Sequence, residues 1–218
     1  MANTSGREHL SSLNALLTHR SVWVRFAALW VLAAAVCLVL WSLGYALLPE
    51  GILRGRLPTQ ALAGGDEALP TRLAEWARIF GLNLTLAAIF IGAVGLIQDE
   101  RGRPLSYVVV MVWAGLYGLL LGTDSFSFPL PGGATAPSLS VLARSGPYEL
   151  SAFALLAAAL RGIARYRIIG RWWSLRQPME PVEPQGLSRQ EWLAVALALL
   201  LLAGSNLVEA DRVVTLSS

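Results

Sequence analysis

The chain alternates long apolar blocks with short polar stretches. Apolar residues run on without amphipathic breaks, and a helix that crosses a bilayer needs about 20 of them. The pattern therefore predicts an all-α bundle of about five transmembrane spans, with residues 22–218 forming one membrane domain. The predicted spans are about residues 26–48, 79–97, 104–122, 148–169 and 192–208.

The fourth block is the least regular. It begins at Tyr148 and meets Arg161, Arg165 and Arg167 before a full crossing length is reached. Long arginine side chains near a helix end can reach the headgroups, so we expect this helix to continue to about Ile169. The Pro- and Gly-rich loop over 123–149 is either extramembrane or re-entrant, and both alternatives stay open.

Two further segments are expected at the membrane surface. Residues 1–21 carry leucines at helical spacing and predict a cytoplasmic amphipathic helix. Residues 73–80 predict a short interfacial helix that leads from a Gly- and Pro-rich loop into the second span. The charged turn over 98–103 is short enough to make the second and third spans an antiparallel hairpin.

Composition agrees with a bilayer as the solvent. The chain is 55% hydrophobic and 14% charged, with a mean hydropathy of +0.56. All 17 basic residues are arginine, and in a membrane protein such an excess indicates topology rather than a nucleic-acid partner. Eleven arginines fall on the side of the N-terminus and six on the other side, which predicts the N-terminus inside and the C-terminus outside. The six predicted to lie outside are Arg54, Arg56, Arg72, Arg78, Arg144 and Arg212.

Small residues recur on one face of the third span. Ala114, Gly118 and Gly122 are spaced by four, and Gly92 contributes a similar position to the second span. Such spacing lets two helix backbones approach closely. We therefore predict a tight hairpin of the second and third spans, while a homo-oligomer remains the alternative use of the same face.

Four polar residues are candidates for function. Asn83 and Asn206 lie in predicted spans, Asp124 ends the third span, and Glu149 begins the fourth. Intramembrane polar groups need partners, so each is explained either by packing or by a polar route through the membrane. For Glu149 the packing alternative is a stabilising position at the positive end of a helix dipole.

Residues that would support catalysis or a cofactor are sparse. His9 and His19 precede the first span, and Cys37 is the only cysteine. We therefore predict no catalytic residues, no metal site and no cofactor. The expected partners are the lipid bilayer and other membrane or envelope proteins.

Residues 144–152, Arg-Ser-Gly-Pro-Tyr-Glu-Leu-Ser-Ala, resemble the His-Gly-x-x-Glu-Leu-Pro-Ala signature of the stage II sporulation protein M (SpoIIM) family. The Asn83 helix and the segment 117–122 resemble two further family segments, over roughly residues 76–159 in all. Ser145, Tyr117 and Ser151 depart from the family's His, Asn and Pro. The resemblance implies a multi-spanning bacterial inner-membrane protein that acts as a scaffold for a cell-envelope complex.

Three functions are consistent with these features. The preferred hypothesis is a non-enzymatic scaffold or accessory subunit. A transporter or permease subunit is the second, with Asn83, Asp124, Glu149 and Asn206 lining its route. The third is a small subunit of a bioenergetic membrane complex.

Overall fold

The computed structural model describes residues 12–56, 69, 71–127, 132–170 and 178–217. Four helical stretches in this part of the chain are long and apolar enough to cross a membrane: Val22–Leu47, Arg72–Ala93, Ser106–Thr123 and Arg189–Thr215. They coincide with the first, second, third and fifth predicted spans. The prediction of a mostly helical protein with several membrane-length helices is confirmed.

The helices are α2 (Val22–Leu47), α4 (Arg72–Leu86), α5 (Ser106–Thr123), α6 (Gly146–Ala159) and α7 (Arg189–Ser217). A π-helical segment, η1 (Ala87–Ala93), continues α4, and two short 3-10 segments are η2 (Leu139–Ala143) and η3 (Leu160–Ile163). α4 begins directly after Thr71, whose hydroxyl accepts a hydrogen bond from the Ala74 amide at 3.2 Å. The predicted interfacial helix is therefore the first part of one continuous helix.

The fourth predicted span is wrong in its length. α6 and η3 end at Ile163, and the chain then leaves the helix to pair with the segment after η1: the amides of Arg165 and Tyr166 both donate to the Leu96 carbonyl, at 2.8 and 3.0 Å. Gly162 meets the carbonyl oxygen of Gly186 closely enough that a side chain there would overlap it. Pairing with a neighbouring strand thus replaces the helical continuation to Ile169.

A small sheet corrects the expectation of a purely helical chain. It contains β1 (Ile97–Gln98), β2 (Tyr166–Ile168) and β3 (Met179–Pro181) in the order β1-β2-β3. β1 and β2 are parallel, whereas β2 and β3 are antiparallel. Strand pairing between distant segments leaves little trace in the hydrophobic pattern of two- or three-residue strands.

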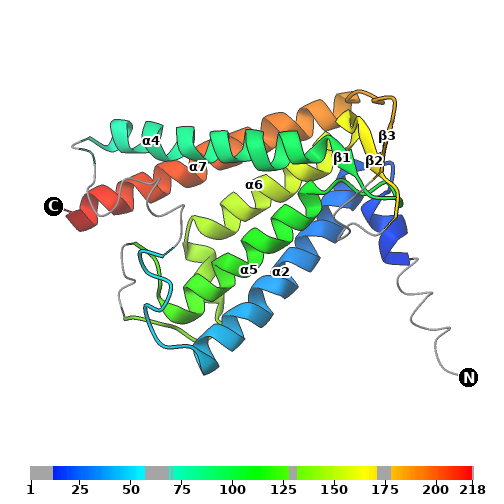
Figure 1. Cartoon of the computed structure of the whole chain (residues 1–218). Coiled ribbons are helices and arrows are strands. Elements are labelled where there is room, and N and C mark those ends of the chain that lie inside the picture. Colours follow the sequence, from blue (N-terminus) through cyan, green and yellow to red (C-terminus); the bar gives the residue numbers. More distant parts are fainter. Residues whose placement is uncertain (1–11, 57–68, 70, 128–131, 171–177, 218) are drawn as a thin grey trace, which may run out of the picture.

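Figure 1 shows α2 and α5 side by side, α4 beside α7, and α6 between the two pairs. The sheet lies at one end of the bundle, called here the sheet end, together with the start of α2 and of α7. The loops after α2 and α5 lie at the opposite end, the loop end. Residues Ala152–Ala159 of α6 are all buried, so this short helix is the core of the described structure.

The small-residue face of α5 packs against α2. A Cβ at Gly122 would lie 2.5 Å from the Trp41 carbonyl oxygen, and one at Gly118 would overlap the Cys37 carbonyl oxygen. A Cβ at Gly92, by contrast, would meet only its own helix, at 3.9 Å. The predicted tight packing of the second and third spans is wrong: α4 packs mainly against α7, and the small-residue face of α5 meets the first span, although η1 still contacts α5 beyond the short turn.

Candidate functional site at the loop end of α6 and α7

α6 begins at a point where the chain must pass close to α5. A side chain at Gly146 would overlap the ring of Tyr117, and Pro147 fits the first helical turn, where no amide hydrogen is needed. The amides of Tyr148 and Glu149 donate to the Ser145 carbonyl at 2.9 and 3.1 Å. This start fixes Glu149 in the first turn of a helix that is largely enclosed by its neighbours.

Glu149 lies against a second carboxyl group. Its Oε1 atom is fully buried and has no hydrogen-bond partner, and its carboxyl group interacts directly with that of Glu209 on α7. Tyr117 and Arg144 lie within electrostatic range of the same place. Glu149 and Glu209 therefore bring two acidic groups together where α6 meets α7, and like charges at such a site repel each other.

Asn83 and Asn206 form an amide pair between α4 and α7. The Asn83 Nδ2 donates to the Asn206 Oδ1 at 3.1 Å, and Asn206 is fully buried with its own Nδ2 unpartnered. Asn206 precedes Glu209 by about one helical turn. Asn83 and Asn206, two of the four candidate residues, are therefore partners. Asn206 lies along α7 from the Glu149–Glu209 pair.

Asp124 belongs to a different arrangement. It follows α5 in the left-handed conformation, with φ of 44°, and ends the helix. Its carboxylate pairs with Arg54 at 3.2 Å, and Arg54 also donates to the Asp124 carbonyl at 2.5 Å. The Gly51 amide donates to the Thr123 carbonyl at 2.6 Å. Asp124 thus joins the loop after α2 to the end of α5.

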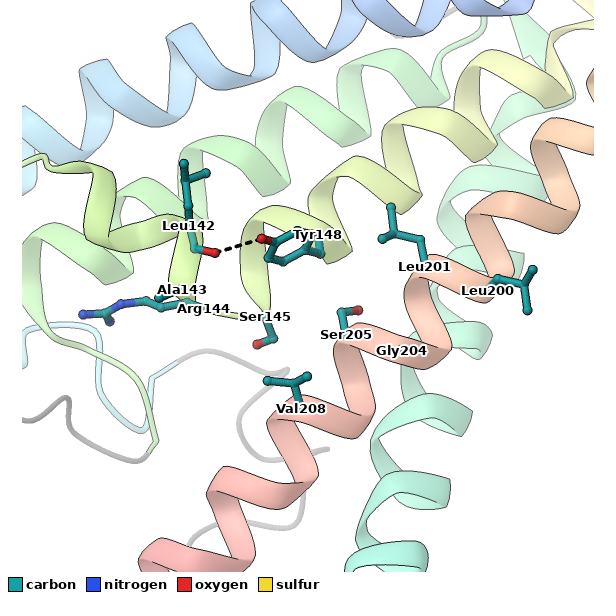
Figure 2. A pocket seen from close by; sticks show the side chains of 10 residues that line it. All are labelled: Leu142, Ala143, Arg144, Ser145, Tyr148, Leu200, Leu201, Gly204, Ser205 and Val208. Carbon is teal, nitrogen blue, oxygen red and sulfur yellow. Dashed lines mark hydrogen bonds between the residues drawn. The ribbon is translucent and has the colours of Figure 1, made fainter.

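A groove of about 460 Å³ opens where α7 passes the start of α6, as Figure 2 shows. One wall is the turn from η2 into α6, and the other is a single face of α7. Its lining is mostly apolar: Leu142, Ala143, Arg144, Ser145, Tyr148, Leu200, Leu201, Gly204, Ser205 and Val208. The hydrophobic pattern did not reveal it, because its walls come from segments about 50 residues apart.

Arg25 connects several segments at the sheet end, although the sequence shows it only as a basic residue before the first predicted span. Arg25 is fully buried, and its Nε donates to the Ala158 carbonyl at the end of α6 at 3.0 Å. Its Nη1 donates to the carbonyls of His19 and Arg20, and its Nη2 pairs with Glu191 of α7 at 2.5 Å. One guanidinium thereby holds the N-terminal segment, α6 and α7 in register.

Glu191 is in turn fixed by Ser188. The Ser188 amide and hydroxyl both donate to Glu191 Oε2 at 2.8 Å, and the Glu191 amide donates back to the hydroxyl at 3.3 Å. This is a capping box, and its Ser-x-x-Glu spacing is visible in the sequence. That signal would have placed the start of the last helix near residue 189 rather than 192.

Comparisons of the chain with family models, with curated proteins and with solved structures give no match. Within the described part of the chain, no three His, Cys, Asp or Glu side chains come close enough together to hold a metal ion.

Proposed function

We propose that the chain is a non-enzymatic scaffold or accessory subunit of a cell-envelope complex, inserted in the bacterial inner membrane through five spans. The closed packing of its core is the observation that carries this proposal. Residues Ala152–Ala159 of α6 are enclosed by α2, α5 and α7, and α2 meets α5 at backbone contact. A bundle packed in this way is suited to holding a fixed surface for other proteins.

Charge supports the proposed orientation. Among the described residues, Arg20 precedes α2, Arg101 and Arg103 lie between β1 and α5, and Arg161 and Arg165 lie between α6 and β2, so all five belong to the sheet end. Arginine accumulates on the cytoplasmic side of membrane proteins, which favours the sheet end inside. The sheet would then be a small cytoplasmic platform.

The resemblance to the SpoIIM family supports the same proposal. Its signature segment, 144–152, contains the turn into α6 and the carboxyl group of Glu149 that contacts α7. In this proposal the signature builds the start of a core helix, and the exposed faces of the outer helices bind the partners.

Crosslinking from those faces tests the scaffold. A photoreactive amino acid would replace one exposed residue at a time: Val31 on α2, Ile89 on η1 or Leu193 on α7. After irradiation in native membranes, the same partner protein should be captured from one face and not from the others, and should co-purify in mild detergent. Capture of no protein from any face, with the chain purifying alone, would contradict the proposal.

A transporter subunit is the second candidate, and the Glu149–Glu209 pair is the feature that favours it. The unpartnered amide nitrogen of Asn206 lies about one turn away along α7. In proteoliposomes with a pH gradient, a proton-coupled transporter would dissipate the gradient, and Glu149→Gln would stop it. Asp211→Asn is the matched control on α7, because its carboxylate pairs with Arg72 and not with this pair. Equal, background leakage in all three proteins would exclude this candidate.

A further inference from the structure

We propose that the groove between α7 and the start of α6 binds an anionic phospholipid, with one acyl chain in the groove and the phosphate at Arg144 and Arg212. This inference rests on the proposed membrane placement, but not on the scaffold role. It concerns a lipid held in a defined position rather than the bulk lipid around the bundle.

The groove lies within the membrane-length part of α7. Its α7 wall covers residues 200–208, close to the middle of the apolar stretch Arg189–Thr215. At 1.5 Å per residue, this wall is about 12 Å long. α6 starts only at Gly146, beside this wall, so among the described residues the outer half of α7 has no full helical neighbour on this side. Non-helical backbone at such a depth needs protein, lipid or water to fill the space beside it.

The shape and chemistry of the groove suit an acyl chain. Leu142, Leu200 and Val208 on its rim are each at least half exposed, so it opens sideways, where lipid would lie. Gly204 forms part of the floor, and a Cβ there would meet nothing within 4 Å. The volume of about 460 Å³ lies in the range of roughly 300–1,000 Å³ that is usual for small-molecule sites.

Nearby backbone carbonyls are already satisfied. The Tyr148 hydroxyl donates to the Leu142 carbonyl at 3.0 Å, as drawn in Figure 2, and Arg212 donates to the Ala143 carbonyl at 2.7 Å. These two carbonyls therefore need no water molecule in the apolar part of the groove as a hydrogen-bond donor. An apolar occupant leaves every one of these hydrogen bonds intact.

The charges at the outer end favour an anion. Arg212 lies one turn beyond Val208 on α7, about 6 Å further along the helix, and its guanidinium reaches the turn that forms the opposite wall. Arg144 on that turn has a buried Nη1 without an acceptor. Of the acids nearby, Asp211 pairs with Arg72, whereas Glu149 and Glu209 face each other within electrostatic range of Arg144. Two arginines with unmet capacity at the end of an apolar groove match a phosphate attached to an acyl chain.

Native mass spectrometry from nanodiscs tests this site. The discs would contain equal amounts of phosphatidylglycerol and phosphatidylcholine, and the wild-type protein should retain one phosphatidylglycerol in preference to phosphatidylcholine. Gly204→Leu fills the floor and should abolish the retained lipid. Gly81→Leu is the matched control, since Gly81 is also a helical glycine with open space above it but lies outside the groove. It should retain the lipid.

The headgroup contact has its own variants, which leave the apolar lining of the groove unchanged. Arg144→Gln combined with Arg212→Gln should remove the preference for phosphatidylglycerol, whereas Arg56→Gln at the same end should keep it. A photoreactive acyl chain should label α7 between residues 200 and 208, which decides the question even if Gly204→Leu does not fold. Retention of lipid by Gly204→Leu, absence of headgroup preference in the wild type, or labelling elsewhere would each overturn the proposal.

Discussion

Replacing Gly118 by alanine tests the closest contact in the bundle. A Cβ at this position would overlap the Cys37 carbonyl oxygen and would lie 3.0 Å from both the Cys37 carbonyl carbon and the Trp41 amide nitrogen. Non-bonded carbon atoms prefer separations of about 3.5–4.0 Å. All three neighbours are backbone atoms of α2, so no side chain can rotate away, and the two helices must move apart.

The expected loss follows from two opposing effects. Overpacking of this kind costs about 1–3 kcal/mol, and the rigid backbone neighbours place Gly118→Ala at the upper end of that range. Alanine favours a helix over glycine by up to about 1 kcal/mol, which offsets part of the loss. We expect Gly118→Ala to lower the free energy of unfolding by about 2 kcal/mol. Gly81→Ala, where a Cβ meets nothing within 4 Å, should leave it unchanged or raise it slightly.

Unfolding in mixed detergent micelles, titrated with a denaturing detergent and followed by circular dichroism, measures these differences. Gly115→Ala provides a graded comparison, because its nearest neighbour, at 2.6 Å, is the flexible end of the Leu40 side chain. Its loss should fall between those of Gly118→Ala and Gly81→Ala. Equal stability of the Gly118 and Gly81 variants would refute the close backbone contact, and equal losses at 115 and 118 would refute the distinction between side-chain and backbone neighbours.

Three further predictions concern the ion pair, the amide pair and the topology. Arg25→Gln leaves a carboxylate of α7 without its cation and should lower the free energy of unfolding by about 3 kcal/mol or more, with a smaller loss for Arg25→Lys; equal losses would contradict the role of the charge. Asn83→Leu and Asn206→Leu should be coupled by about 0.6–1.7 kcal/mol in a double-mutant cycle measured by detergent unfolding, whereas additive losses would mean no interhelical bond. A cysteine at Arg165 should react with an impermeant thiol reagent only from the cytoplasmic side and one at Arg56 only from the outside; the reverse pattern would invert the proposed topology.

Much of the helical framework was predictable from the sequence. Four apolar blocks gave the membrane-length helices to within a few residues at most ends, because a run of about 20 apolar residues is a local property. The small residues spaced by four on α5 lie on the face that meets α2. The choice of its partner was wrong, because chain proximity through a short turn does not decide which helices pack.

The candidate site was predictable only in its parts. Glu149, Asn83 and Asn206 stood out as polar residues in apolar surroundings. Glu209 and Arg25 did not stand out, since Glu209 resembles an ordinary interfacial carboxylate and the buried Arg25 resembles an ordinary basic residue before a span. Arg25 and Glu191 are more than 100 residues apart in the sequence, and so are Asn83 and Asn206. Glu149 and Glu209 are closer together.

The sequence by itself determined which segments are helical and apolar enough for a bilayer, because backbone hydrogen bonds within a helix and hydrophobicity along it are both local. Tertiary structure decided the length of α6, the sheet, the pairing of α5 with α2 and the groove beside α7. Each of these depends on which backbone groups and side chains meet across the bundle. Which groups meet depends on how the whole surfaces of the helices fit together, and no single stretch of sequence holds that information.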